Sequence, residues 1–302
     1  MPPEGDVDLK GFLQAELERV EAALSTSLDV LGGKVPAGFR EALQHGVSSG
    51  GKRLRPILCV AAYGAAGGRH PEIYSLAISL ELIHAYSLMH DDLPCMDDAD
   101  LRRGEPTTHS VFGEEKTMVA GALLIPAAAL QAWEASRRME LPEDVGRSLV
   151  GELTRAAGGG GMVGGQVLDL LGEEKSLSGP ELDELHRKKT GALLRASLRM
   201  GGIAAQAHDQ AIRALDRYGE AIGLAFQITD DILDATSTPE ALGKNPSDVQ
   251  LGKSTYVSLF GLQEASRKAR ALVREAVTSL REGDLVAPEL EALAHFIVER
   301  KR

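Results

Sequence analysis

Apolar residues at helical spacing run through almost the whole chain. The first such segment places apolar side chains three and four residues apart, at Leu9, Phe12, Leu13, Leu17, Val20 and Leu24. This period is typical of an amphipathic helix, and it returns at 71–92, 114–136, 143–156, 162–171, 180–201, 207–235, 252–281 and 288–300. We find no segment with the apolar–polar alternation of a strand. Only 4% of the residues are aromatic, although strands favour aromatic side chains. The sequence therefore predicts an all-α fold.

Proline and glycine interrupt the helical pattern. Pro36 and the Gly50–Gly51 pair break it early, and Pro71 is placed for a first helical turn. Pro94 ends the segment that follows Pro71, and residues 236–251, with two prolines and a glycine, are predicted to form a loop. With no long linker and no repeat of solenoid length, we expect residues 1–302 to form a single domain.

Charge and cysteine content exclude several classes of protein. Acidic residues outnumber basic ones by 44 to 33, for a net charge of −11, which excludes a general nucleic-acid binder because phosphate backbones demand basic surfaces. Cys59 and Cys95 are the two cysteines, too few for a disulfide framework or a Cys-rich zinc site, and they fit a reducing compartment. The sequence has no run of about 18 apolar residues, which is the length that a membrane span requires. The polar, acidic residues after Met1 have no apolar stretch suited to a signal peptide. We therefore expect a cytoplasmic protein.

Two dense clusters of aspartates are the most unusual feature of the sequence. The first, HDDLPCMDDAD at 90–100, follows an apolar helix, and the second, QITDDILD at 227–234, lies inside an apolar run. Gln227, Asp230 and Asp234 of the second cluster share one helix face. Two like charges 4 Å apart repel by about 4 kcal/mol at an effective dielectric of 20. A divalent cation removes this repulsion, and Mg²⁺ is typically held by one or two carboxylates plus substrate phosphates. A solvated acidic loop is the alternative for the first cluster.

Basic residues stand beside glycines and beside the aspartate clusters. They occur in GGKRLRP at 50–56, at Arg102–Arg103, at Lys188–Lys189, and at Lys244 and Lys253 after the second cluster. Any one of these patches could be a solvated face, but together they indicate a phosphorylated ligand in an otherwise acidic chain. Arginine offers phosphate a two-pronged hydrogen-bonding fork, and lysine offers a point charge.

Three other short motifs match the sequence, but their surroundings do not support the functions that they would indicate. Residues 158–165 contain GxGxxG, but no strand precedes them, so close helix packing or a bend explains the glycines better than a dinucleotide site. Residues 252–254 resemble the end of a P-loop, although Ser247 stands where a glycine is required. His90–Asp91 resembles the metal dyad of HD phosphohydrolases, which would not predict the second aspartate cluster.

Taken together, the motifs resemble those of the trans-prenyltransferase family, the all-α isoprenyl diphosphate synthases, over about residues 40–280. GGKRLRP at 50–56, DDLPCMD at 91–97, RR at 102–103, GGQ at 164–166, KT at 189–190 and FQITDDILD at 226–234 match in the family's order, as do Lys244 and Lys253. The resemblance implies the isoprenoid synthase fold, a bundle of about ten or more helices around a central active-site cavity. It also implies a homodimer that uses isopentenyl diphosphate and allylic prenyl diphosphates, such as dimethylallyl and geranyl diphosphate.

The resemblance also implies roles for individual residues. Magnesium on the allylic diphosphate would be ligated by Asp91, Asp97 and Asp230, supported by Asp92, Asp231 and Asp234. Arg102, Lys189, Lys244 and Lys253 would neutralise that diphosphate. Lys52, Arg55, His84 and Arg103 would bind isopentenyl diphosphate, and Lys189, Thr190 and Gln227 would place polar groups near the developing carbocation. No nucleophilic side chain is needed, so Cys59 and Cys95 are expected to take no part.

Product length is expected to depend on the helix that ends at Asp91. Tyr86 lies five residues before Asp91, about 7.5 Å along a helix axis, and is followed by the small Ser87. An aromatic at this position resembles the family's tunnel floor for fifteen carbons, which implies farnesyl diphosphate as the product. A core or interface role for Tyr86 is the alternative, and geranylgeranyl or geranyl diphosphate are the alternative products. The rival functions are a class I terpene cyclase and a non-catalytic synthase subunit, but both aspartate clusters and GGKRLRP favour chain elongation.

Overall fold

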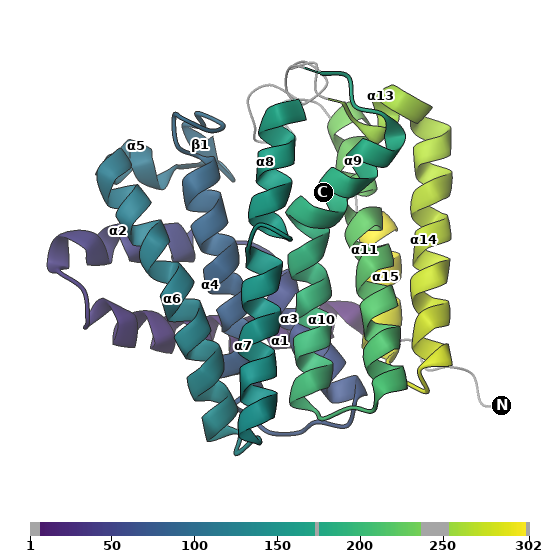
Figure 1. Cartoon of the computed structure of the whole chain (residues 1–302), viewed down its shortest axis with the longest axis horizontal. Coiled ribbons are helices and arrows are strands. Elements are labelled where there is room, and N and C mark those ends of the chain that lie inside the picture. Colours follow the sequence, from purple (N-terminus) through teal and green to yellow (C-terminus); the bar gives the residue numbers. More distant parts are fainter. Residues whose placement is uncertain (1–6, 173–174, 237–253, 300–302) are drawn as a thin grey trace.

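The chain is an up-and-down helical bundle (Figure 1). The computed structural model describes residues 7–172, 175–236 and 254–299. Its helices are α1 (Leu9–Gly32), α2 (Ala37–Ser48), α3 (Leu54–Ala65), α4 (Ile73–Asp91), α5 (Thr108–Phe112), α6 (Glu114–Arg138), α7 (Glu143–Ala157), α8 (Met162–Gly172), α9 (Gly179–His186), the π-helical η1 (Arg187–Gly191), α10 (Ala192–Ala204), α11 (Asp209–Thr236), α13 (Tyr256–Phe260), α14 (Leu262–Glu282) and α15 (Pro288–Glu299). The predicted all-α class is confirmed.

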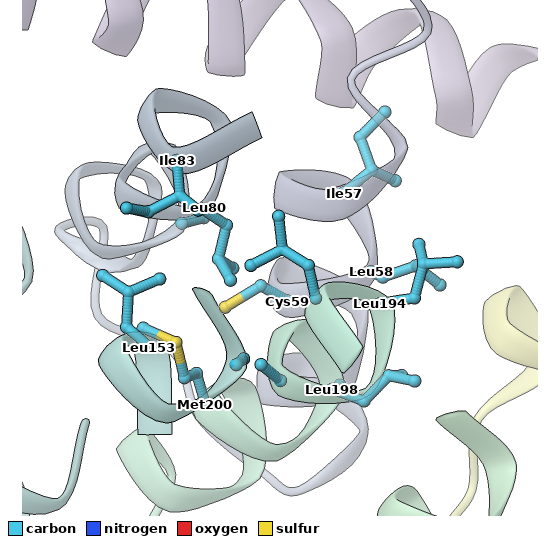
Figure 2. Packing of buried hydrophobic residues seen from close by; sticks show 14 of the residues in the cluster. Ile57, Leu58, Cys59, Leu80, Ile83, Leu153, Leu194, Leu198 and Met200 are labelled. Atoms are coloured by element: carbon cyan, nitrogen blue, oxygen red, sulfur yellow. The ribbon is translucent and has the colours of Figure 1, made fainter. Parts of the chain in front are cut away.

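The apolar faces of the helices meet in a core centred on α4 and α10. Helix α4 is apolar on all sides, as expected of a helix in the middle of a fold, and it packs against α3 and α6, while α10 packs against α3, α7 and α11. Figure 2 shows side chains of α3, α4, α7 and α10 meeting there, with Cys59 among them. Burial raises the pKa of Cys59 to about 12, so its thiol stays protonated and acts as a packing group.

Local sequence explains where several helices begin. The Asp8 carboxylate accepts a hydrogen bond from the Gly11 amide and caps α1. Ser178 and Glu181 form a capping box at the start of α9, and Thr255 and Ser258 form one at the start of α13. Each box satisfies backbone N–H groups that the first helical turn leaves without a partner.

Some element boundaries differ from the prediction. The segment 252–281 is not one helix, because Gly261 adopts a left-handed φ of 79° and separates α13 from α14. Helices α2 and α3, each 12 residues long, lie outside the predicted segments, since Pro36 and the Gly50–Gly51 pair bound them and leave only a short periodic pattern. Helix α4 begins at Ile73, after Pro71.

A short hairpin lies beside the C-terminal end of α4. Its strands β1 (Leu101–Arg102) and β2 (Glu105–Pro106) pair antiparallel, and each is only two residues long, too short for a recognisable alternation. Within the described ranges, α6 alone is long and apolar enough to cross a membrane by length and composition. A helix of a packed bundle also meets that test, and α6 packs against α4 and α7.

Candidate active site

The motifs that are far apart in the sequence gather at one end of the bundle. In Figure 1 the end of α4, the β1–β2 hairpin, the upper part of α8 and the end of α11 all lie toward the top. The segment η1 contacts both α8 and α11. The side chains described below connect these elements into one site.

The two adjacent aspartates at the end of α4 have different surroundings. Asp92 is buried and receives hydrogen bonds from the Arg102 guanidinium of the hairpin at 2.5–2.8 Å. Among the described residues, no arginine fork binds Asp91. Burial raises the pKa of Asp91 to about 6; Lys189 and Arg102 act against this shift, and the Asp97 and Asp92 carboxylates add to it. Asp91 is therefore a carboxylate surrounded by other charges, with Asp92 engaged by arginine.

The GGKRLRP segment forms a tight turn before α3. Gly50 and Gly51 adopt positive φ values of 75° and 133°, which only glycine adopts readily. Arg103 of the hairpin donates a hydrogen bond to the Gly50 carbonyl. A Cβ atom on Gly51 would lie 2.6 Å from the Arg103 guanidinium, so glycine also makes room for this contact.

Cations of the GGKRLRP segment and of the hairpin lie around His84. Burial lowers the pKa of Arg55 to about 10, against the opposing carboxylates of Glu81 and Asp230. The Nε of Arg55 is buried with no hydrogen-bond partner in the described part of the chain. Burial and the charges of Arg55 and Arg103 hold the pKa of His84 well below its ordinary value. His84 is thus neutral and offers hydrogen bonds, whereas Arg55 and Arg103 carry the positive charge; Lys52 is exposed at the turn.

The π-helical segment η1 presents Lys189 and Thr190 to the site. Lys189 Nζ lies 2.5 Å from a carboxylate oxygen of Asp169 on α8, and the Thr190 hydroxyl donates to Gln227 Oε1 of α11 at 3.1 Å. Neighbouring glycines allow this approach: a Cβ on Gly165 would overlap the Lys189 backbone nitrogen, and one on Gly223 would lie 2.8 Å from the Gly191 Cα. Single π turns inside α-helices are frequent at functional sites.

The second aspartate cluster also divides into different environments. Asp231 is buried, accepts a hydrogen bond from the Tyr256 amide at 2.8 Å and receives another from Gln227 at 3.3 Å. Asp231 thereby links α11 to the start of α13. Asp230 and Asp234 are half-buried, and the Asp230 charge acts on Arg55. Since Lys189 acts on Asp91 and Thr190 bonds to Gln227, both aspartate clusters face one common space.

Tyr86 and Ser87 lie on α4 below Asp91. Tyr86 is buried and meets the His90 ring edge-on at 5.4 Å, while His90 Nε2 lies 3.0 Å from the Met118 carbonyl of α6. The Ser87 hydroxyl donates to the His84 carbonyl. The tyrosine therefore belongs to the packed core as well as to the helix that delivers Asp91.

Several residues at or beside the site were not predicted from the sequence. Asp169 holds Lys189; its position three residues after Gln166 of the GGQ motif was the available signal. Tyr256 stacks against His186 at 5.7 Å and donates its hydroxyl to Asp183, which also receives Lys268 Nζ at 3.1 Å. These partners are distant in the sequence, so spacing could not reveal them. Lys244 and Lys253 lie outside the described residues.

The carboxylates of the two aspartate clusters supply the oxygen ligands that magnesium prefers, although the described residues do not form a complete metal site by themselves. Among the described residues, no group of three or more His, Cys, Asp and Glu side chains is arranged to hold a metal. Mg²⁺ usually takes only one or two protein carboxylates and completes its shell with substrate phosphates and water. The crowded negative charge that helps to raise the pKa of Asp91 fits a cation that arrives with a diphosphate.

Comparison with known proteins identifies the family. The family model for polyprenyl synthetase matches residues 36–289. Farnesyl diphosphate synthase of Escherichia coli (strain K12) is 45% identical over 87% of this chain and 89% of its own length. Geranylgeranyl pyrophosphate synthase 11, chloroplastic, of Arabidopsis thaliana is 40% identical over 99% and 86%. The crystal structure of a geranyltransferase from Legionella pneumophila aligns with a TM-score of 0.83 at 32% identity over 97% of both chains. The protein therefore belongs to the polyprenyl synthetase family and is a trans-prenyltransferase.

Proposed function

We propose that this enzyme joins isopentenyl diphosphate first to dimethylallyl and then to geranyl diphosphate in a magnesium-dependent reaction. The two condensations yield farnesyl diphosphate, and each releases one diphosphate. One observation carries the proposal: two aspartate clusters lie at one end of the bundle together with two sets of cations, which meet at Arg102. One set, Arg102 and Lys189, acts on Asp91, and the other, Arg55 with Arg103, surrounds His84. Two substrates that both carry diphosphate require two such sets.

The first step is departure of diphosphate from the allylic substrate. Asp91, Asp97 and Asp230 would hold magnesium, with Asp92, Asp231 and Asp234 supporting them, and the bound metal would supply charge neutralisation of the leaving group. Arg102 and Lys189 would add positive charge at the same diphosphate. The C–O bond breaks, its electron pair leaves with diphosphate, and an allylic cation remains. The apolar helical interior keeps water from this cation.

The second step forms the new carbon–carbon bond. Lys52, Arg55 and Arg103 would bind the isopentenyl diphosphate, with neutral His84 as a hydrogen-bonding group. The isopentenyl double bond attacks the cation, and the proton lost from the resulting carbocation goes to the released diphosphate. The oxygens of Thr190 and Gln227, held together at 3.1 Å, would stabilise positive charge during this step.

Tyr86 supports a fifteen-carbon product. Its buried ring lies five residues before Asp91 on α4, where an elongating chain would meet it after a limited number of additions. The geranylgeranyl pyrophosphate synthases among the relatives make the twenty-carbon product the second candidate.

Incubation of the protein with magnesium chloride, dimethylallyl diphosphate and labelled isopentenyl diphosphate tests the proposal. We expect a linear fifteen-carbon diphosphate and release of inorganic diphosphate, both abolished by EDTA. A cyclic hydrocarbon would indicate a terpene cyclase, and no reaction of folded protein would indicate a non-catalytic subunit. Either outcome would refute the proposed reaction.

We also propose that the enzyme is a homodimer. Helix α6 exposes an apolar stripe that includes Met118, Val119, Ile125 and Leu130, each 40–52% exposed. Burial of this stripe against a second copy would remove apolar surface from water, which favours association.

A further inference from the structure

Arg53, the middle cation of GGKRLRP, is bound by two glutamates and a backbone carbonyl. Its side chain is buried, with Nε 2.7 Å from Glu21 of α1, Nη1 2.7 Å from Glu81 of α4 and Nη2 3.1 Å from the Val47 carbonyl at the end of α2. One guanidinium thus joins three helices to the turn that carries Lys52 and Arg55. Arginine can do this because its planar fork presents several donors in fixed directions.

The backbone at Arg53 needs such an anchor. Arg53 adopts a left-handed φ of 46° immediately before α3, a conformation that is unfavourable for an L-residue. Because the side chain is fixed at three points, the turn is held in this conformation. The two neighbouring cations are held with it, Lys52 directly before Arg53 and Arg55 in the first turn of α3.

Glu81 is the buried end of this anchor. It is 3% exposed on α4, one turn before His84, and its Oε1 accepts the Arg53 hydrogen bond. Its Oε2 has no hydrogen-bond partner in the part of the chain that the structure describes. Burial lowers the pKa of both Arg55 and Arg103, and the Glu81 carboxylate opposes that effect in each case. Glu81 therefore lies at the base of the cationic group around His84.

We propose that Glu81 and Arg53 are positioning residues for the isopentenyl diphosphate site, which they shape through the 50–56 turn without touching the ligand. This inference rests on the proposed function, because that function assigns the turn to isopentenyl diphosphate. Positioning and simple electrostatics predict opposite results. If Glu81 acted only through its charge, its neutralisation would leave a more positive pocket and strengthen diphosphate binding. If it holds Arg53 and the turn, the same change weakens binding.

Steady-state kinetics of Glu81→Gln and Arg53→Lys separate these cases. Gln keeps the shape of Glu81 and loses its charge, while Lys keeps the charge of Arg53 and loses the fork that reaches three partners. We expect the KM for isopentenyl diphosphate to rise about tenfold or more in both variants, with the KM for geranyl diphosphate changed by less than about twofold. Circular dichroism confirms that each variant is folded, and if Glu81→Gln does not fold, Arg53→Lys decides.

Glu16→Gln is the matched control. Glu16 is also a buried acid, 6% exposed, and it pairs with Arg19 and Tyr74 in the α1–α4 contact. We expect this variant to lose stability without a change in either KM. An unchanged or lowered KM for isopentenyl diphosphate in the folded variants would overturn the inference while the wild-type condensation stands. A wild type that condenses nothing would instead overturn the proposed function.

Discussion

Neighbouring aspartates of one motif have different surroundings at this site. Asp91 and Asp92 are adjacent in DDLPCMD, yet Asp92 is held by the Arg102 fork while burial raises the pKa of Asp91 to about 6. Asp230 and Asp231 also differ in their surroundings, because Asp231 is buried and accepts a hydrogen bond from the Tyr256 amide, whereas Asp230 is half-buried. The sequence could locate the aspartate clusters, but it could not show which aspartates are held by hydrogen bonds. The hydrogen-bond partners come from other segments of the chain.

Tyr86→Ala tests the proposed floor of the product tunnel. Truncation of this buried ring on α4 opens space below Asp91, so the growing chain can extend further before it meets a wall. We expect chromatography of the labelled products to show chains of twenty carbons or longer as a major product, where the wild type stops at about fifteen.

Tyr63→Ala is the control for that experiment. Tyr63 is likewise buried, on α3, and its hydroxyl accepts a hydrogen bond from the His70 amide outside the site. This variant should lose stability, because a large core side chain is removed, and should keep the wild-type product. Unchanged product length in Tyr86→Ala would assign Tyr86 to the core alone.

Asp169→Asn tests how Lys189 is held. The lysine loses its charged partner at 2.5 Å, so it no longer has a fixed position toward the leaving diphosphate. We expect kcat to fall about tenfold with little change in the KM for isopentenyl diphosphate. Asp216→Asn, which disrupts ion pairs with Arg195 and Arg199, should leave kcat unchanged. A wild-type kcat in Asp169→Asn would show that the ion pair does not assist the reaction.

At the scale of elements, helical periodicity predicted most of the long helices but not their interruptions. The segment 180–201 is helical throughout, yet η1 inserts a π turn at Arg187–Gly191, which turns Lys189 and Thr190 toward α8 and α11. The π turn lies inside one continuous apolar segment and shifts the phase of its pattern only once, so a search for helical periodicity does not separate it from the flanking α-helices. The glycines at 158–165 were predicted to serve close helix packing or a bend, and Gly165 does pack closely, against the Lys189 backbone.

Gly165→Ala tests the contact between α8 and η1. The added methyl group would overlap the Lys189 backbone, and overpacking of this kind costs about 1–3 kcal/mol. We expect a lower midpoint in urea unfolding and a reduced kcat, because Lys189 and Thr190 move with their backbone. Gly160→Ala is the matched control, since nothing lies within 4 Å of a Cβ there. Equal stability and kcat in the two variants would contradict this view of the site.

At the scale of the molecule, the bundle turns motifs far apart in the sequence into one site. Residues near 55, 91, 103, 169, 189 and 230 belong to separate elements. The alternating direction of the helices brings the ends of α4, α8 and α11 and the hairpin to the same end of the bundle (Figure 1). The sequence predicted the fold class, which the structure confirms, and it supplied the candidate residues of the site. It did not predict the internal anchors, such as Arg53 with Glu81 and Tyr256 with Asp183, because neither pair has a characteristic spacing.

The exposed stripe of α6 predicts how the whole molecule associates. Leu130 lies on this stripe, 47% exposed, so Leu130→Glu would place a charge in an apolar interface, which opposes association. We expect sedimentation equilibrium to show a wild-type dimer and a variant that dissociates at micromolar concentration. Val286→Glu, on a side chain 84% exposed before α15, adds the same charge elsewhere and should remain dimeric. A monomeric wild type, or a Leu130→Glu dimer as tight as the control, would show that α6 is not the interface.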